Sequence, residues 1–346
     1  IIQNKIWRKR SSAALIINKY DREQECNNMN FSDKLARKII EKQNPSVLGL
    51  DPKLEYIPDS IKRKAFDEYS CFEQAAAHSI AEFNKRLIDA VCDIIPAVKP
   101  QLAYYEMYGI HGIWVFNETV KYAKSKDLIV IADGKRNDIG STSEAYASAY
   151  LGKTDINGEN KEIFDADALT VNGYLGSDGI KPFVEACEKY GKGIFVLVKT
   201  SNLSSGELQD LTLDDGRKVY EAMADMVNEW GRTTKGQCGY SSVGAVVGAT
   251  YPEQLKLLRK RMPESWILVP GYGAQGGKAS DVAHAFDKDG LGAVINASRS
   301  LMCAYKSERW KNEYSAEEFD KAARAEAVRM KEEIGQFIFD RKENKG

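Results

Sequence analysis

A short charged segment, Asp133-Gly-Lys135-Arg-Asn-Asp138, holds the residues best suited to chemistry. It follows the apolar run 129–132, which is typical of a buried strand. Asp133 and Lys135 are two positions apart, so both side chains point to one face while the strand continues. Carboxylates beside a lysine keep it protonated. Such an ammonium can stabilise developing negative charge and then donate a proton.

Polar residues are also expected at the ends of the other strands. The set, read from the predicted strand ends, is Asp51, Lys99, Asn172, Thr200, Ser201, Gln275 and Arg299. A salt-bridged loop would account for Asp133 and Lys135 alone. Polar residues at nearly every strand end favour a site, with Lys99 on the strand before Asp133 as a further charged member.

Two segments near the C-terminus are suited to binding an anion. The glycine-rich turn 270–277 contains Gln275, and the last predicted strand ends with Asn296, Ser298 and Arg299. Backbone N–H groups, an amide and a guanidinium that converge there would hold a phosphate dianion. Barrel enzymes often bind phosphate after strands seven and eight. The alternative is a turn with a surface arginine.

Eight short β-branched runs alternate with helical patterns from Phe31 onward. The expected strands are 47–50, 97–102, 128–132, 168–171, 193–198, 243–248, 266–269 and 292–296, and helices are expected within 71–95, 217–230, 252–262 and 317–338. This alternation predicts an α/β fold, a single (β/α)8 TIM barrel with its catalytic residues at the C-terminal ends of the strands. An open, doubly wound sheet is the alternative, but no GxGxxG follows the first strand.

Three segments lie outside this βα alternation. The insertion 201–216 follows the fifth strand, where active-site loops lie, and is either a lid or a surface insertion; 152–165 is a second polar insertion. Residues 1–28 are expected to be a leader or dispensable tail, with a transit peptide as the alternative. Met29 begins a cleaner amphipathic pattern. We therefore expect a catalytic barrel over 29–346 with an N-terminal helical extension.

The composition excludes several classes of protein. The 346 residues are 43% hydrophobic and 29% charged with a net charge of −1, which gives no electrostatic footprint for nucleic acid. The longest apolar run, 194–198, is too short to span a bilayer. Six scattered cysteines without CxxC spacing predict free thiols in the cytoplasm. No histidine or cysteine spacing indicates a zinc site, and no cofactor is expected.

Four ordered motifs resemble the orotidine 5′-monophosphate decarboxylase family. They are D-x-K-x-x-D at 133–138, VLGLDP at 47–52, KTSN at 199–202 and PGYGAQGG at 270–277, and the resemblance covers about 30–337. The segment TVNGYLGSD at 170–178 is similar to the longer-chain branch, and the insertions to eukaryotic parasite forms. The resemblance implies cofactor-independent decarboxylation of orotidine 5′-monophosphate (OMP) to uridine 5′-monophosphate (UMP), the last step of de novo UMP synthesis.

The resemblance also implies roles for individual residues. Lys135 matches the lysine that protonates C6 of the pyrimidine, and Asp133 the carboxylate beside the substrate carboxylate. Lys99 matches the second lysine of this charge network. Asp138 and Thr142 match residues that reach the partner's site in a homodimer. The remaining expected substrate contacts are Asp51 (ribose), Ser201 (pyrimidine), Gln275 and Arg299 (phosphate), Asn172, Thr200 and Ser298.

Some questions stay open at this point. Gln101 departs from the expected family residue, so its role is undecided. A metal-dependent sugar-phosphate barrel shares D-x-K-x-x-D but would need a carboxylate in place of Lys99. An aldolase would use Lys135 or Lys199 as a Schiff-base nucleophile among apolar neighbours. A nucleotide-binding barrel without activity is the third alternative. The sequence also leaves open an association with an orotate phosphoribosyltransferase.

Overall fold

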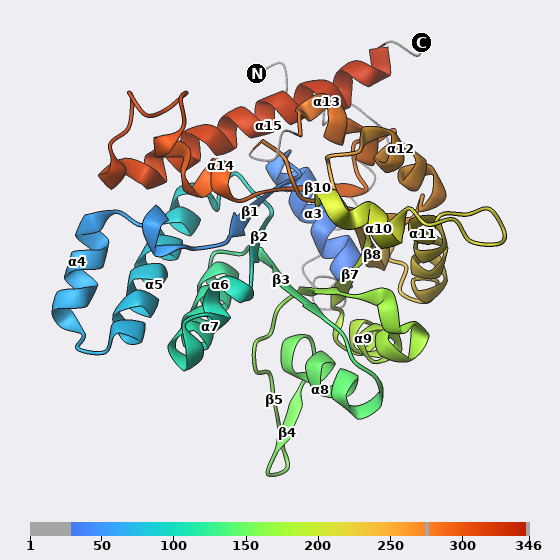
Figure 1. The fold of residues 1–346 in the computed structure, drawn as a ribbon, viewed down its shortest axis with the longest axis horizontal. Helices are drawn as coiled ribbons and strands as arrows, with labels where there is room; N and C mark the ends of the chain where they lie inside the picture. Colours follow the sequence, from blue (N-terminus) through green and yellow to red (C-terminus); the bar gives the residue numbers. More distant parts are fainter. Residues whose placement is uncertain (1–28, 274–276, 344–346) are drawn as a thin grey trace.

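The computed structural model describes residues 29–273 and 277–343, and its centre is a closed barrel of eight strands (Figure 1). The strands pair in the order β1-β10-β9-β8-β7-β6-β3-β2, and every pair is parallel. Their bounds are β1 Ser46–Leu50, β2 Ala97–Pro100, β3 Ile129–Arg136, β6 Ala168–Val171, β7 Gly193–Lys199, β8 Ser241–Val247, β9 Ser265–Val269 and β10 Ala293–Ala297. The predicted (β/α)8 barrel is confirmed.

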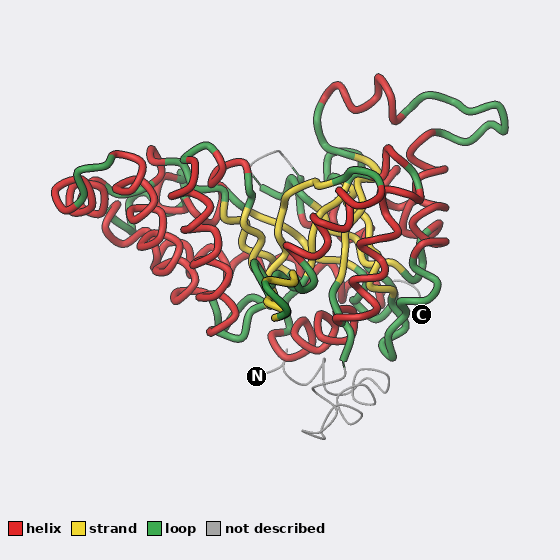
Figure 2. The backbone as a smooth tube through the Cα atoms, turned by 90° about the horizontal axis from the view of Figure 1, so that it is seen from below, coloured by secondary structure: helices red, strands yellow, loops and turns green. Residues whose placement is uncertain are grey.

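Helices surround the strands on the outside, as Figure 2 shows. Their bounds are α3 Phe31–Lys42, α4 Asp59–Glu68, α5 Phe72–Val91, α6 Ala103–Glu106, α7 Gly109–Ser125, α8 Gly140–Tyr150, α9 Ser177–Tyr190, α10 Gly206–Gln209, α11 Val219–Trp230, α12 Pro252–Arg261, α13 Ala279–Val282, α14 Arg299–Met302 and α15 Phe319–Glu343. The four helices expected from the sequence correspond to α5, α11, α12 and α15. No helix of the described chain is long and apolar enough to cross a membrane.

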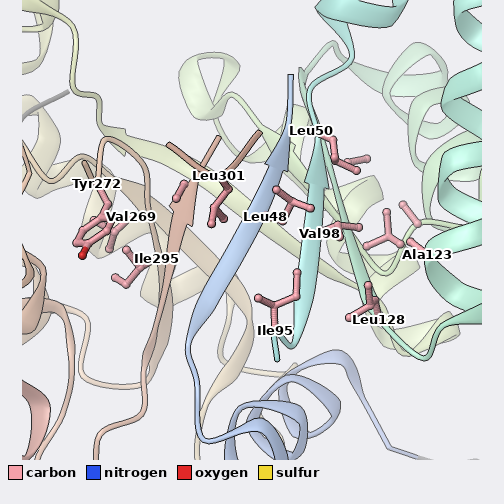
Figure 3. Packing of buried hydrophobic residues seen from close by; sticks show 14 of the residues in the cluster. Leu48, Leu50, Ile95, Val98, Ala123, Leu128, Val269, Tyr272, Ile295 and Leu301 are labelled. Atoms are coloured by element: carbon pink, nitrogen blue, oxygen red, sulfur yellow. The ribbon is translucent and has the colours of Figure 1, made fainter. Parts of the chain in front are cut away.

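Alternate residues of the strands form two separate apolar layers, because successive side chains point to opposite faces of a sheet. The outer layer packs against the helices, and Figure 3 shows Leu48, Val98 and Ile295 on three neighbouring strands of it. The inner layer contains Val47, Ala97, Ile131, Phe195 and Val294.

The N-terminal helical extension is α3, which closes the N-terminal end of the barrel. Asn30 caps the helix, because its side chain accepts the N–H of Asp33 at 3.0 Å. Phe31 and Leu35 belong to the same buried cluster as the inner strand residues. Gly193 permits this packing, since a Cβ there would lie 2.2 Å from the Phe31 ring. Among the described residues, α3 thus covers this end of the barrel interior.

The two insertions have structure of their own. The first forms a hairpin of β4 Thr154–Ile156 and β5 Glu159–Lys161. The second contains the 3₁₀ turn η4 Leu203–Ser205 followed by α10, and in Figure 1 it lies beside α11. The cysteines of the described residues, at 71, 92, 187, 238 and 303, are free thiols as expected, whereas Cys26 lies outside the described residues.

Candidate active site

A cavity of about 660 Å³ lies at the C-terminal end of the barrel. Residues that follow or end the strands line it, as a TIM-barrel site requires. It contains eight of the predicted site residues: Asp51, Lys99, Asp133, Lys135, Thr200, Ser201, Ser298 and Arg299. Most of the polar set read from the sequence is thus brought to one place.

The inward-facing positions of β2 and β3 change from apolar to polar toward the cavity. On β3, buried Ile131 is followed two residues later by Asp133 and then by Lys135. The same two-residue steps lead from Ala97 to Lys99 on β2 and on to Gln101 beyond it. Alternation along a strand therefore joins the apolar interior to a charged rim.

The carboxylate of Asp133 is the centre of this rim and accepts four hydrogen bonds. Its Oδ2 accepts from Lys99 Nζ at 2.6 Å and from Gln101 Nε2 at 2.9 Å. Its Oδ1 accepts from Lys135 Nζ at 2.7 Å and from Thr170 Oγ1 at 2.8 Å. These groups come from β2, β3 and β6 and from Gln101, the residue that follows β2. The carboxylate is fixed in position before any ligand binds.

The charges of this network support one another. Burial on its own raises the pKa of Asp133, but the ammonium groups of Lys99 and Lys135 outweigh burial and hold that pKa below its usual range. Burial lowers the pKa of Lys99, yet the carboxylates of Asp133 and Asp51 more than compensate and raise it. The side chains of Lys99 and Asp133 are only 5% and 9% exposed, whereas that of Lys135 is 46% exposed. Lys135 is therefore the member of the network most open to a ligand.

The backbone at Lys135 adopts an unusual conformation. Its φ is 47°, in the left-handed region that non-glycine residues seldom adopt. The backbone N–H of Lys135 donates to Thr170 Oγ1 at 3.0 Å, and that hydroxyl also donates to Asp133. Thr170 thus links the backbone of Lys135 to the carboxylate that binds its side chain. Such conformations are common at functional sites, where neighbouring groups hold them.

The other wall of the cavity offers hydrogen-bond acceptors. Asp51 Oδ1 and Asn296 Oδ1 are buried and accept no hydrogen bond from the described residues, although Lys99 Nζ lies 3.9 Å from that Asp51 oxygen. Gly49 allows the side chains of Ser298 and Asn296 to pack closely against β1, because a Cβ there would lie 2.0 Å from Ser298 Oγ and 2.9 Å from Asn296 Oδ1. Buried acceptors without donors are costly unless a ligand supplies the hydrogen.

Four predicted site residues are not found in this cavity. Asp138 follows β3, and its Oδ1 accepts the N–H of Ile139 at 2.8 Å. Thr142 is exposed on α8. Asn172 is exposed and caps the turn η3 Gly173–Leu175, where its side chain accepts the N–H of Tyr174. Gln275 lies outside the described residues.

Several cavity residues were not among the predicted ones. Thr170 and Asn296 both lie on strands, and the role of Gln101 was left open. The two-residue alternation used for Asp133 and Lys135 places all three on the inward face, since each lies two positions beyond an inward-facing residue. Lys53 also lines the cavity, but it follows β1 in a loop where no periodic signal applies.

Comparison with known proteins agrees with this geometry. Residues 48–311 match the model of the orotidine 5′-phosphate decarboxylase / HUMPS family. The chain belongs to this family. Orotidine 5′-phosphate decarboxylases of Caldicellulosiruptor saccharolyticus and Rhodopirellula baltica are 43% and 45% identical to it, each over 310 residues. These alignments cover 90% and 88% of this chain and 99% of each relative.

Solved structures of the decarboxylase family share the barrel. A Toxoplasma gondii structure described as an orotidine-monophosphate decarboxylase is 30% identical, with a TM-score of 0.69, and the match covers 89% of this chain and 98% of that one. A Streptomyces avermitilis structure is 29% identical, with a TM-score of 0.70, over 92% of this chain and 99% of that one. The relatives include both bacterial and parasite proteins, so the similarity of this chain to a eukaryotic branch stays a prediction.

Proposed function

We propose that the chain decarboxylates orotidine 5′-monophosphate to UMP without a metal ion or organic cofactor. Membership in the family supports the reaction, and the observation that carries it is the Lys99–Asp133–Lys135 network at the rim of the cavity. The described residues include no group of three or more His, Cys, Asp or Glu side chains that could hold a metal ion. Lys99 also stands where the metal-dependent alternative needs a carboxylate.

The reaction requires an electrostatic catalyst. When the C6–carboxylate bond breaks, its electron pair stays on C6, an sp² ring carbon with no adjacent electron sink. The ammonium of Lys135 lies at the open side of the network and would stabilise this charge. Its proton would then form the C6–H bond of UMP, after which the lysine regains a proton from water. Asp133, held by four donors, would keep the ammonium in place.

The remaining cavity residues would orient the nucleotide. The orphan oxygens of Asp51 and Asn296 suit hydrogen bonds from the ribose hydroxyls. Ser298 and Arg299, at the start of α14, suit the phosphate, and Thr200 and Ser201 suit the pyrimidine. Binding energy from the phosphate and ribose can then position the reacting carbon beside Lys135.

A direct assay tests the activity. Purified protein in EDTA should convert OMP to UMP, followed by the change in ultraviolet absorbance and by release of carbon dioxide. A protein without turnover would contradict the proposed function and favour the nucleotide-binding alternative. Activity that EDTA removes and magnesium restores would favour the metal-dependent one.

The phosphate contact has its own test. Arg299→Ala should lower kcat/KM for OMP by about tenfold or more, because a charge-assisted hydrogen bond is worth roughly 1.5–3 kcal/mol. The same substitution should change kcat/KM for orotidine, which lacks the phosphate, much less. An equal loss on both substrates would mean that Arg299 acts on the fold instead.

We further propose a homodimer in which Asp138 and Thr142 complete the partner's site. Neither residue lines the cavity of its own chain. Large apolar side chains are exposed on the segments that follow the neighbouring strands β2, β3 and β6, namely Met107, Ile110, Ile139, Tyr174 and Leu175. Such a surface favours contact with a second copy, and most homo-oligomers are symmetric dimers.

Complementation between inactive variants tests the shared sites. Lys135→Ala and Asp138→Ala chains should each be inactive alone and regain activity when mixed and re-associated. In each heterodimer one site carries both substitutions and the other carries neither. An equal random mixture yields about half heterodimers, so activity should approach about a quarter of wild type. A mixture that stays inactive despite shown subunit exchange would place Asp138 in its own chain's site.

Two finer proposals concern the cell. The free thiols of the described residues suit a reducing compartment, and we propose the cytoplasm, which microscopy of a tagged chain would test. Association with an orotate phosphoribosyltransferase stays a prediction, and co-purification of the two proteins would test it.

A further inference from the structure

Lys199 lies at the end of β7 but does not face the cavity. Residues Phe195 and Leu197 face inward, so strict alternation would place Lys199 in the cavity as well. The pairing of β7 with β8 shifts register between Leu197 and Lys199. Such a bulge redirects the side chain. Lys199 is therefore absent from the cavity lining and only 1% exposed, whereas the next two residues, Thr200 and Ser201, line the cavity.

The buried ammonium is fully paired with the insertion that follows β7. Lys199 Nζ donates to Asp210 Oδ1 at 2.9 Å and Oδ2 at 3.0 Å, and to Ser205 Oγ at 3.2 Å. The rings of Tyr220 and Tyr251 lie 5.7 and 5.1 Å from it. An ammonium has three donors, and all three have acceptors here. This environment suits a structural cation, and it does not suit Lys199 as the Schiff-base nucleophile of an aldolase.

A second contact ties the same insertion to Thr200. Gln209 Oε1 accepts the N–H of Thr200 at 2.9 Å, and Gln209 Nε2 donates to Thr200 Oγ1 at 2.8 Å. Thr200 Oγ1 in turn donates to Asn202 Oδ1 at 2.6 Å. The consecutive residues Gln209 and Asp210 thus bind the consecutive residues Thr200 and Lys199. The insertion returns to the strand from which it departs.

Polar contacts, not apolar burial, hold this segment. Leu203, Leu208 and Leu211 are 96%, 49% and 53% exposed, so the insertion contributes little apolar surface to the core. A segment with few buried apolar contacts opens readily unless other contacts hold it. The Lys199–Asp210 pair is the contact that can do so, because the Asp210 side chain is 40% exposed but the Lys199 side chain is 1% exposed, and an unpaired ammonium at that depth would be costly.

We propose that Lys199 and Asp210 form a clasp that positions Thr200, Ser201 and Asn202 for the substrate. The three residues line the cavity, and the clasp begins at the residue immediately before them. Lys199 and Asp210 are positioning residues, since neither of them lines the cavity itself. The inference rests on the proposed function for its kinetic consequence, but its structural consequence can be measured without substrate.

Hydrogen exchange and kinetics test the clasp together. In Lys199→Met, amide exchange of residues 200–212 in the unliganded protein should accelerate by about tenfold or more, because the segment loses its buried anchor. KM for OMP should rise by about tenfold while kcat changes by less than about threefold. Asp210→Ala should accelerate exchange at least as much, since it leaves the ammonium buried and unpaired. Asp210→Glu, which keeps the carboxylate, should lie closer to wild type than Asp210→Ala.

Lys192→Met is the matched control. Lys192 precedes the first residue of the same strand, is 11% exposed and pairs with Asp165 at 2.6 Å, far from the cavity end. The Lys192→Met variant should leave both the exchange of 200–212 and KM unchanged.

The clasp is refuted if Lys199→Met leaves this exchange at the wild-type rate, or if Lys192→Met accelerates it equally. If Lys199→Met does not fold, Gln209→Ala carries the same expectation for exchange and KM. A wild-type protein without decarboxylase activity would overturn the proposed function alone, because the exchange measurement would still decide on the clasp.

Discussion

Two Lys–Asp–Lys arrays occupy opposite ends of this barrel. The rim array lies at the C-terminal ends of the strands and consists of Lys99, Asp133 and Lys135. The base array lies before the strands begin and consists of Lys124, Asp165 and Lys192. In both, one carboxylate bridges two ammonium groups, and in both its pKa is held below the usual range by those groups against the opposing effect of burial.

The arrays differ in burial and in their surroundings. The side chain of Asp133 is 9% exposed and that of Asp165 is 29% exposed. Thr170 and Gln101 add two neutral donors to Asp133, while the base array uses the backbone carbonyl of Asp165 as a further acceptor. The rim array contributes all three members to the cavity of about 660 Å³. The base array contributes only Lys124 to a smaller one of about 370 Å³.

This comparison shows that an alternation of charges does not by itself make a catalytic site. The base array pairs both of its ammonium groups with Asp165 and joins α7 to the segments before β6 and β7. The rim array has a lysine that is nearly half exposed, beside a carboxylate that is rigidly held. What distinguishes the rim is therefore the combination of a fixed counter-ion with an ammonium that a ligand can reach.

The largest expected difference between the arrays is in catalysis. Lys135→Ala should reduce kcat below about one per cent of wild type, a loss above roughly 3 kcal/mol, because one group supplies both charge stabilisation and the proton. Lys124→Ala should leave kcat within about twofold. Steady-state kinetics with thermal unfolding as a folding check would measure both. More than one per cent residual kcat in folded Lys135→Ala would mean that another group donates the proton.

A smaller difference is expected in stability. Asp133→Asn removes the close counter-ion of buried Lys99 and leaves it the Asp51 carboxylate at 3.9 Å. It should lower the free energy of unfolding at pH 7 by about 3 kcal/mol. Asp165→Asn should cost about 1 kcal/mol, since Asp165 is itself 29% exposed and solvent screens its ion pairs. Urea unfolding at pH 7 would measure both. Equal losses would contradict the difference in burial.

The same variants predict a pH dependence. A carboxyl group with a depressed folded-state pKa stabilises the protein above its unfolded pKa of about 3.9 and loses that contribution as pH falls through the lower folded value. The difference in unfolding free energy between wild type and Asp133→Asn should therefore shrink as pH falls from about 5 to about 2. Urea unfolding at several pH values would show it. A difference that is constant over this range would mean that the carboxylate is not the source.

The sequence predicted the rim array more completely than the contacts that hold it. The spacing of Asp133 and Lys135 fixed their common face, and buried runs of eight strands fixed the barrel. Alternation also extends to Thr170, but a threonine on a strand carries no signal of its own because most such residues only pack. Lys199 could not be placed from alternation, since the bulge in β7 depends on tertiary pairing. Asp138 and Thr142 are expected to act in the site of a second chain, and this role stays a prediction.

The smallest expected effect concerns Thr170, which has no counterpart in the base array. Its hydroxyl accepts the N–H of Lys135, whose φ is positive, and donates to Asp133 Oδ1. Thr170→Val keeps the side-chain shape but removes both hydrogen bonds, so Lys135 and its counter-ion Asp133 lose their shared support. We expect kcat/KM to fall by about tenfold, or roughly 1.4 kcal/mol, near the value of one hydrogen bond to a charged group. Thr170→Ser retains the hydroxyl and should stay within about twofold of wild type. If the serine variant is as impaired as the valine variant, the methyl group matters through packing, and the backbone of Lys135 is held by its neighbours on β3 instead.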